Sequence, residues 1–349
     1  MKIQYRCTAL SSALLGALLL TACSKQEAPP AAETAAVDAA PTDTAAEPAF
    51  PERPYFGDTH LHTSYSVDAG AFGARISPSE AYVFAKGNEI TASSGQPAKL
   101  RRPLDFLVVA DHSDAMGMFP LIFNGAPEVM GDPQGRKWNE MIKSGQGAAA
   151  AMDIIVNFSA GKISKAFLPL PGTKSYSDAW QATIKAAEDA NDPGRFTAFI
   201  GYEWTSNTGG NNLHRNVIFR DNADKASKVE PYTTMKPLGS DDPVDLWKWM
   251  DAYQTSTGGR VLAIAHNGNL SNGLMFPTVE AFGKKLDAEY VTARDKWERL
   301  YETTQTKGTG EAHPYLSPDD EFADFEIWDK GKLTGSAAKS KDMLQHEYT

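Results

Sequence analysis

Short apolar runs alternate with helix-like segments from residue 53 onward, and this alternation restricts the fold more than any other feature of the chain. The run LDFLVVAD at 104–111 is apolar almost throughout, as expected of a strand that is buried on both faces. Strands that alternate with helices in this way favour a parallel sheet or a barrel of βα units. We therefore expect one large α/β domain over residues 53–349.

Further strands and helices are expected from the same apolar runs and helix-like segments. We expect strands at 53–58, 104–111, 196–204, 214–220, 260–269 and 298–305. We expect helices at 77–87, 176–191, 242–254 and 286–300. The stretch at 115–175 is less regular and rich in Gly and Ala, which indicates an insertion that covers one face of the domain.

The N-terminus is typical of an exported bacterial protein. Residues 1–22 contain two basic residues, the apolar core SSALLGALLL and a small-residue ending before Cys23. Two interpretations are open, a lipoprotein signal with lipidation of Cys23 or an ordinary cleavable signal, and we expect the first. Ser24, directly after the lipidated cysteine, then predicts a lipoprotein of the outer membrane that faces the periplasm or the cell surface. Residues 23–52, rich in Ala, Pro, Thr and acidic residues, predict a disordered tether.

Composition excludes several classes of function. The two cysteines, Cys7 and Cys23, would leave no free thiol in the mature chain, which excludes disulfides and cysteine catalysis. Loss of Lys2 and Arg6 with the signal would take the net charge from −10 to −12, which disfavours nucleic acid as a partner. We expect a small-molecule partner and membrane contact only through the lipid anchor, and the sequence does not determine the oligomeric state.

Metal-ligating residue types stand at the ends of the apolar runs. These are His60 and His62 after the first run, His112 after the second, Glu203 near the end of the third, His214 before the fourth and His266 after the fifth. Each has a simpler explanation by itself, such as a solvated ring, a buried ion pair or a turn. Because strand ends of a parallel α/β fold converge on a ligand, their recurrence favours one shared site.

The H-x-H pair provides the chemistry. His60 and His62 lie two residues apart, so an extended chain places both rings on one side, close enough to share a cation. Histidines together with carboxylates suit Zn, Mn or Fe. A carboxylate is expected beside each imidazole to fix its tautomer, and Asp58 and Asp111 are the candidates.

These motifs carry a resemblance to a known superfamily. GDTHLHTSYSVDA (57–69), VVADHSD (108–114), GYEWTS (201–206), HRNVIF (214–219) and HNGN (266–269), in this order, resemble the metal-binding motifs of the PHP (polymerase and histidinol phosphatase) superfamily. The stretch at 301–331, YETTQTKGTGEAHPYLSPDDEFADFEIWDKG, resembles a bacterial family of secreted PHP-like proteins known as a domain of unknown function.

The resemblance implies a distorted (β/α)7 barrel and a phosphoesterase that uses a metal-bound hydroxide at a site of two or three ions. It implies the metal ligands His60, His62, Asp68, His112, Glu203, His214 and His266, with Glu203 bridging two ions. Asp68 stands where many relatives have histidine, and a carboxylate there suits Mn, Fe or Mg better than Zn.

For other residues the sequence leaves two roles open. Arg215 beside His214 would either bind a phosphoryl oxygen or form a surface salt bridge. His214 or His266 would protonate the leaving group if metal ions do not occupy both nitrogens of the ring. Trp204 would either line the bottom of the substrate pocket or belong to the hydrophobic core, and we expect the core.

The loop TKGTGEAHP carries the candidate substrate-binding residues Lys307, Glu311 and His313, and a solvated loop is the alternative. The Asp-x-His motif that closes PHP sites does not follow His266, so we expect a chain that is truncated at its C-terminus and lacks the last strand or strands. The alternative functions are hydrolysis of a non-phosphate ester or amide, and metal or solute binding without catalysis.

Overall fold

The fold is that of a computed structural model, which describes residues 53–331, 339, 341–344 and 346–348. The expected signal peptide at 1–22, Cys23 and the tether at 23–52 lie outside these residues. Arg53–Thr349 form one compact unit. None of the helices in the described part of the chain has both the length and the apolar character that crossing a membrane requires.

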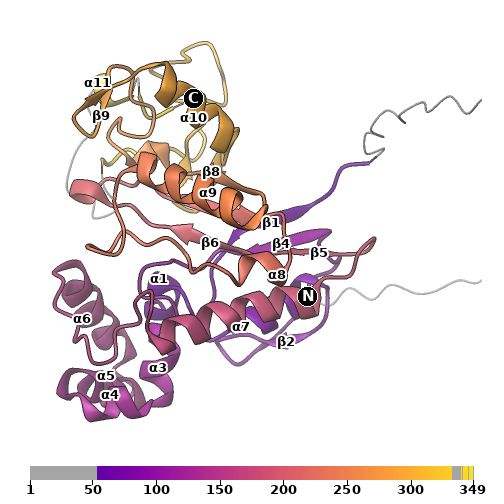
Figure 1. Ribbon diagram of the computed structural model, residues 1–349, viewed down its shortest axis with the longest axis vertical. Coiled ribbons are helices and arrows are strands. Elements are labelled where there is room, and N and C mark those ends of the chain that lie inside the picture. Colours follow the sequence, from indigo (N-terminus) through magenta and orange to yellow (C-terminus); the bar gives the residue numbers. More distant parts are fainter. Residues whose placement is uncertain (1–52, 332–338, 340, 345, 349) are drawn as a thin grey trace, which may run out of the picture. The chain divides into compact units, whose positions relative to one another are not determined.

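Two sheets occupy the centre of this unit (Figure 1). One is parallel, in the order β1-β4-β5, and the other has the order β11-β8-β7-β6. Their strands are β1 (Gly57–Leu61), β4 (Phe106–Val109), β5 (Thr197–Phe199), β6 (Gly201–Trp204), β7 (Arg215–Phe219), β8 (Val261–Ala265) and β11 (Leu300–Tyr301). Small hairpins pair β2 (Ile90–Thr91) with β3 (Pro97–Ala98), β9 (Glu280–Ala281) with β10 (Lys284–Lys285), and β12 (Thr304–Gln305) with β13 (Gly308–Thr309).

The two sheets join where β4 ends. His112, just beyond β4, forms a parallel bridge with Glu203 of β6. β5 and β6 are consecutive segments that are separated only by Ile200. Across the two sheets the strand order is therefore β1, β4, β5 (continued by β6), β7, β8 and β11. The strand ends that carry the predicted metal ligands lie at the same edge.

One strand runs in the direction opposite to that expected. β7 is antiparallel to both β6 and β8, although the sequence favoured a parallel arrangement. A parallel crossover needs a long connection, usually a helix, whereas the link at 205–214 contains only the 3-10 turn η1 (Thr208–Gly210). The α/β class is confirmed, but the described strands form several small sheets and no closed barrel.

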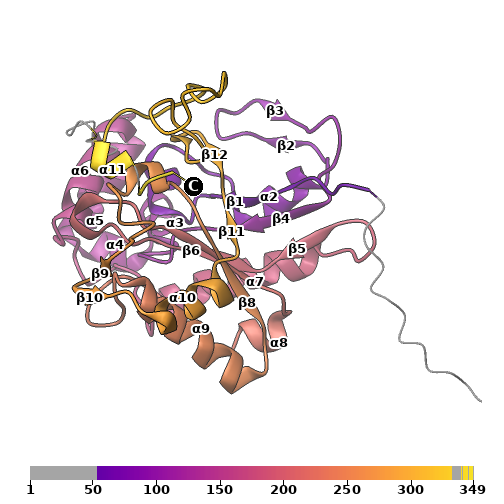
Figure 2. The same cartoon turned by 90° about the horizontal axis from the view of Figure 1, so that it is seen from above.

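Helices cover the strands. They are α1 (Val67–Ala71), α2 (Pro78–Ala85), α7 (Lys174–Ala190), α8 (Ala223–Ala226), α9 (Pro243–Thr257), α10 (Ala288–Trp297), α11 (Lys341–Leu344) and the 3-10 turn η2 (Gly268–Leu270). Figure 2 shows α8, α9 and α10 on the side of the strands opposite the β2–β3 hairpin. The predicted helices at 77–87, 176–191, 242–254 and 286–300 are all confirmed, with ends that differ by a few residues.

Local sequence explains where these helices begin. The Ser77 side chain accepts from the backbone N–H of Glu80, whose carboxylate in turn accepts from Ser77 N–H, and Pro78 occupies the first helical position of α2. α9 starts in the same way, with Asp242 as N-cap before Pro243.

The main core lies between the sheet and the helices α2, α7 and α9. At its centre, Trp180, Tyr202, Trp204 and Phe219 are buried together. The Trp180 and Tyr202 rings meet edge to face at 6.1 Å, the geometry that aromatic pairs prefer. The core interpretation of Trp204 is thus confirmed.

Residues 115–175 contain the helices α3 (Met118–Asn124), α4 (Pro127–Gly131), α5 (Pro133–Lys143) and α6 (Gly147–Ser159). They form a separate apolar cluster around Trp138 and Phe119. α1 packs against α3 and α6. This packing requires Gly70, because a Cβ there would lie 2.6 Å from Cγ of Phe119. The segment therefore supports α1, which carries Asp68 to the edge of the sheet.

Candidate metal centre

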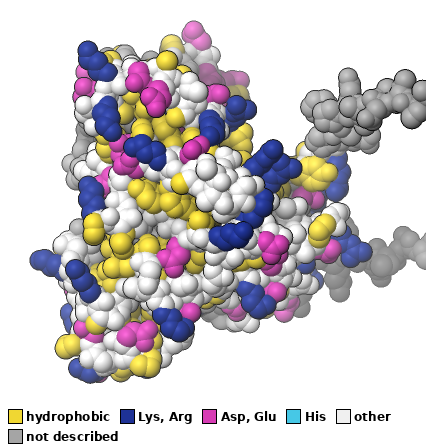
Figure 3. All heavy atoms as spheres, viewed as in Figure 1, with side chains coloured by type: hydrophobic (Ala, Val, Ile, Leu, Met, Phe, Trp, Pro, Cys, Tyr) yellow, Lys and Arg dark blue, Asp and Glu magenta, His cyan; other side chains and the backbone are white. Residues whose placement is uncertain are grey.

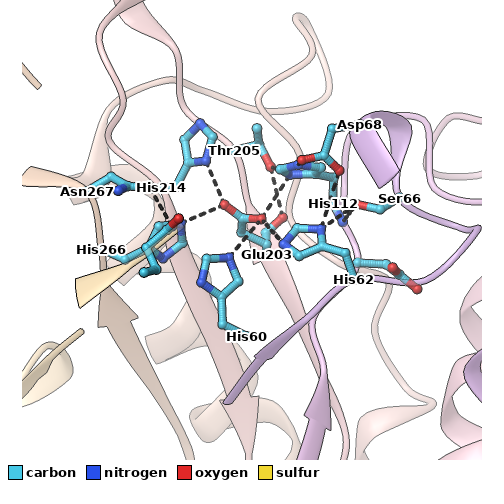
Figure 4. A network of polar contacts seen from close by, with 12 residues as sticks. His60, His62, Ser66, Asp68, His112, Glu203, Thr205, His214, His266 and Asn267 are labelled. Carbon is cyan, nitrogen blue, oxygen red and sulfur yellow. Dashed lines mark hydrogen bonds and ion pairs between the residues drawn. The ribbon is translucent and has the colours of Figure 1, made fainter. Parts of the chain in front are cut away.

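Side chains from the strand ends surround one buried carboxylate (Figure 4). Glu203 in β6 is completely buried. Five imidazoles face it, with His214 Nδ1 at 2.6 Å, His266 Nε2 at 2.9 Å, His62 Nε2 and His112 Nδ1 each at 3.1 Å, and His60 Nε2 at 3.6 Å from its oxygens. The structure thus brings together all five histidines that flank the apolar runs.

The direction of β7 explains the place of His214. β4 and β8 deliver their histidines after their last residues, and β1 carries His60 as its penultimate residue with His62 directly after it, whereas His214 precedes the first residue of β7. An antiparallel strand begins at the edge where its neighbours end. His214 therefore reaches Glu203 from the start of its strand.

Asp68 lies at the rim of this cluster. It belongs to the first turn of α1, and its Oδ2 is 3.1 Å from His112 Nε2 while its Oδ1 is 3.5 Å from His62 Nδ1. Its side chain is 41% exposed, in contrast to the 1% exposure of Glu203. Asp68 is thus the part of the cluster most open to solvent.

One member of the cluster was missed in the sequence. Glu302 directly follows β11, and its Oε2 lies 2.9 Å from Nδ1 of His60. Its backbone N–H donates to Ala265 O, so the pairing of β11 with β8 fixes its position. The repeated Tyr-Glu at the end of an apolar run, in GYEWT at Glu203 and LYETT at Glu302, was the available signal.

The expected carboxylate partners of the imidazoles have other roles. Asp58 accepts from the backbone N–H of His60, and the buried Asp111 accepts from the backbone N–H and the hydroxyl of Thr63. Both therefore hold the chain that follows β1 in place. The prediction that they orient the rings was wrong, because each carboxylate lies beside backbone amides instead.

Other polar groups lie against the imidazole nitrogens. Ser66 Oγ is 2.6 Å from His62 Nδ1, and Thr205 Oγ1 is 2.5 Å from His112 Nδ1. Asn207 Oδ1 is 3.1 Å from His214 Nε2. These neutral groups fix ring orientations without adding charge.

The donor set fits metal ions. His60 Nε2, Glu203 Oε2, His214 Nδ1 and His266 Nδ1 are buried without a hydrogen-bond partner. Buried polar atoms without partners are rare in folded proteins, and an ion is one of the groups that can satisfy them. Four sets of ligand atoms lie within 4.8 Å of one another and can hold an ion: His60, His62 and Glu203; His60, His266 and Glu302; His62, Asp68 and His112; and His112, Glu203 and His214.

Charge within the cluster is unevenly distributed. Burial would raise the pKa of Glu203, but the nearby His112 and His214 hold it well below its usual range. Burial would lower the pKa of His60, yet Glu203 and Glu302 outweigh it and raise the pKa to about 10. Burial prevails at His214 and lowers its pKa to about 4. Because metal ligands must be deprotonated, metal uptake would release protons.

Arg215 does not face this cluster. The sequence left open a phosphoryl contact or a surface salt bridge, and the structure shows neither. The side chain is buried, and its Nε donates to Glu298 at 2.9 Å. Neighbouring residues of a strand point to opposite faces, so Arg215 points away from His214 and packs over the ring of Trp204 at 5.8 Å.

The three candidate substrate residues are placed differently. Lys307 is half-buried at the turn between β12 and β13. Its charge opposes the rise that Glu203 and Asp68 cause in the pKa of His112, and it adds slightly to the lowering of the pKa of His214 by burial. Its backbone carbonyl accepts from Asn269, in the loop after β8. Glu311 is exposed, and the ring of His313 lies 5.3 Å from that of Tyr348. Of the three, only Lys307 acts electrostatically on the imidazole cluster.

Comparison with known proteins identifies the family. Residues 49–349 match the family described as "Protein of unknown function (DUF3604)", so the chain belongs to that family. Searches of curated proteins and of solved structures find no match to this chain.

Proposed function

For this member of the DUF3604 family, we propose a metal-dependent hydrolase of the cell envelope that cleaves phosphoesters. The observation that carries the proposal is the convergence of five imidazoles on the buried carboxylate of Glu203. Clusters of buried histidine and carboxylate with strongly shifted pKa values are characteristic of functional sites. The order of the motifs, which resembles that of the PHP superfamily, supports the same reading.

The chain's own residues would hold two ions that share Glu203. His60 and His62 would complete one site, and His112 and His214 the other. When bound, such ions lower the pKa of water to near neutrality and stabilise charge on a phosphoryl group. Zn, Mn and Fe all suit this mixture of imidazole and carboxylate.

A third site is proposed at the rim. Asp68 lies near both His62 and His112, and it is the most exposed of the three. A carboxylate in this position favours Mn or Fe over Zn. The proposal of two or three ions therefore depends on Asp68.

Lys307 would bind the substrate. No hydrogen bond or ion pair of its ammonium is found within the described residues, and its charge acts on His112 and His214. A cation beside the centre would attract an anionic group such as a phosphoryl oxygen and hold it over the imidazoles. This charge favours a phosphoester over a neutral ester.

His214 would serve as a ligand instead of a proton donor. Its Nε2 lies 3.1 Å from the Asn207 side chain, whereas its Nδ1 faces Glu203 at 2.6 Å and is buried without a hydrogen-bond partner. Nδ1 is therefore the nitrogen that would bind an ion, and neither nitrogen would be left to protonate a leaving group. The proposed catalytic contributions of the chain are thus the shared carboxylate of Glu203, the orientation of the imidazoles and the charge of Lys307.

The cellular location and the PHP barrel also remain proposals. Lipidation at Cys23 would tether the enzyme in the cell envelope, on the outer membrane. The net charge of −10 disfavours nucleic acid as a partner, and acidic and basic side chains are interspersed on the face shown in Figure 3. A small anionic ester in the periplasm or at the cell surface is the proposed substrate.

Hydrolysis assays test the proposal. The full chain, loaded in turn with Mn²⁺, Zn²⁺ and Fe²⁺, is assayed on p-nitrophenyl phosphate, bis-p-nitrophenyl phosphate and p-nitrophenyl acetate, with Glu203→Gln as the inactive control. We expect turnover of a phosphoester that a chelator abolishes. Turnover of the acetate alone would favour a different esterase, and stoichiometric metal without turnover of any ester would indicate a binding protein.

A further inference from the structure

We infer that Glu302 is a positioning residue: its carboxylate accepts the Nδ1–H of His60 and thereby turns Nε2 of that ring toward the cation that His60 would share with His62 and Glu203. This inference rests on the proposed function, since it takes His60 to be a metal ligand. It assigns a role to a side chain that lies outside the five motifs quoted for metal binding.

The two edges of the His60 ring face two different carboxylates. Nδ1 lies 2.9 Å from Oε2 and 3.2 Å from Oε1 of Glu302. Nε2 lies 3.6 Å from Oε2 of Glu203, and it is buried without a hydrogen-bond partner. A neutral imidazole donates from one nitrogen and accepts at the other. With the proton at Nδ1 held by Glu302, the free lone pair points toward Glu203.

His62 repeats this arrangement. Its Nδ1 lies 2.6 Å from Ser66 Oγ, and its Nε2 lies 3.1 Å from Glu203 Oε2. Both rings of the H-x-H pair thus present Nε2 to the same carboxylate oxygen. The outer partners differ, because Nδ1 of His62 contacts the neutral Ser66 hydroxyl, with the Asp68 carboxylate farther away at 3.5 Å, whereas Nδ1 of His60 contacts the charged Glu302 at 2.9 Å. A carboxylate partner raises the basicity of a metal-binding imidazole, so His60 would be the stronger ligand of the two.

A competing role is that Glu302 itself binds an ion together with His60 and His266, whose ligand atoms also cluster. In that arrangement His60 would bind through Nδ1, and its buried Nε2 would remain without a partner beside Glu203. It would also place the two histidines of the H-x-H pair on different ions, although both face the same oxygen of Glu203. The positioning role satisfies both nitrogens of His60 and keeps the pair together.

Strand pairing holds Glu302 in this place. Its backbone N–H donates to Ala265 O at 3.0 Å, directly after the register pair of Tyr301 with Ala265. The side chain is 17% exposed and that of His60 is 10% exposed, so solvent screens their contact little. Substitution of Glu302 should therefore alter mainly the orientation and the basicity of the His60 ring.

Metal affinity and stoichiometry distinguish the two roles. Zn²⁺ binding to the full chain is measured by competition with a chromophoric chelator and by elemental analysis, for wild type, Glu302→Gln, Glu302→Ala and His60→Ala. The exposed Glu321→Gln is the matched control. Loss of a second partner of a metal-binding histidine weakens metal affinity about 10- to 100-fold. We expect Glu302→Ala to show this loss at one site with unchanged stoichiometry, and Glu302→Gln, which retains an acceptor, to show less.

The opposite results would overturn the inference. If Glu302→Gln and Glu302→Ala each lose one ion per chain, as His60→Ala should, Glu302 is a ligand. If both bind Zn²⁺ as the wild type and Glu321→Gln do, Glu302 has no role in metal binding, while the proposed function stands. If the wild type binds no Zn²⁺, the inference and the proposed metal centre fail together.

A second measurement needs no variant of Glu302. The ¹⁵N chemical shifts of the histidine side chains in the Zn²⁺-loaded wild type report which nitrogen carries the proton and which binds metal. We expect His60 to be protonated at Nδ1 and bound through Nε2, with its resonances assigned from the His60→Ala spectrum. A His60 ring bound through Nδ1 would contradict the positioning role even if the Glu302 variants failed to fold.

Discussion

Replacing Arg215 by Met should destabilise the fold without removing a substrate contact. The guanidinium is 1% exposed and pairs with the equally buried carboxylate of Glu298, with Nε to Oε1 at 2.9 Å and Nη2 to Oε2 at 3.4 Å. It also donates to the backbone O of Leu213 at 2.5 Å. Trp247 Nε1 donates to Glu298 at 2.8 Å. The pair therefore ties β7 to α9 and to the end of α10.

The magnitude follows from what is left behind. Met fills much of the space of Arg215 but leaves Glu298 buried with fewer donors. Removal of one partner of a buried ion pair costs about 3–5 kcal/mol in free energy of unfolding. For a domain of this size, about 2–4 °C in Tm accompanies each kcal/mol, so Tm should fall by roughly 6–20 °C. Glu298→Gln in the same chain should recover about 0.5–3 kcal/mol, because it removes the unpaired charge.

The pH dependence of stability should reverse sign. In the wild type, burial would raise the pKa of Glu298, but Arg215 and Arg294 hold it below its ordinary value of 4.5. This carboxylate therefore contributes stability above pH 4.5, and the contribution is lost as pH falls through the lower pKa of the folded state. In Arg215→Met, burial is opposed by the more distant Arg294 and by the hydrogen bond from Trp247, without the main counter-charge. The pKa should then exceed 4.5, and the variant should gain stability relative to the wild type as pH falls toward this value.

Urea unfolding, followed by tryptophan fluorescence of the metal-free chain at pH 7 and pH 5, measures both effects. Arg299→Met is the matched control, because Arg299 and its partner Asp295 are 71% and 74% exposed and such pairs contribute at most about 1 kcal/mol. If Arg215→Met unfolds within 1 kcal/mol of the control while the KM for a phosphoester rises, Arg215 is a substrate residue and the reasoning is wrong.

Three further outcomes test the centre. Glu203→Gln should lower metal content by at least one ion per chain and reduce turnover more than about 100-fold, beyond the loss expected of an outer partner; full metal content would contradict its shared role. Lys307→Met should raise the KM for a phosphoester about 10- to 100-fold at unchanged metal content, the range expected for a lost hydrogen bond to a charged group. The exposed Lys228→Met is its control, and an equal effect on a neutral ester would count against an anion contact. Zn²⁺ at 100 times its Kd should raise the free energy of unfolding by about 2.7 kcal/mol. Urea titration with and without chelator measures this change. An unchanged midpoint would show that the folded chain binds Zn²⁺ no better than the unfolded chain does.

The imidazoles of the centre were predictable because each follows or precedes a strong apolar run. His112, for example, comes after LDFLVVAD, which forms β4 and ends at Val109, two residues earlier than expected but at the same edge of the sheet. Glu302 was not predictable in the same way. The run at 298–305 was expected to be one strand, with Glu302 in its middle, but β11 stops at Tyr301. The missed residue is therefore a consequence of an uncertain strand end.

The direction in which a side chain points was harder to predict than its position at a strand end. Arg215 adjoins His214 in sequence, yet alternation along the strand sends the two side chains to opposite faces. Asp111 adjoins His112 but holds the backbone of Thr63 instead of a ring. Nearness in sequence therefore did not predict which group touches an imidazole. That choice is made by residues such as Ser66, whose hydroxyl is brought to His62 by the turn that follows β1.

The position of a histidine relative to its apolar run carries information about strand direction. In VVADH the histidine follows the run, and β4 is parallel to its neighbours β1 and β5. In HRNVIF the histidine precedes the run, and β7 is antiparallel to both neighbours. If all ligands must meet at one edge of the sheet, a strand that carries its ligand at its first residues has to be antiparallel to neighbours that carry theirs at the end. The reversed direction of β7 therefore follows from the sequence once the shared site is assumed, whereas the repeated βα pattern alone favours the wrong direction.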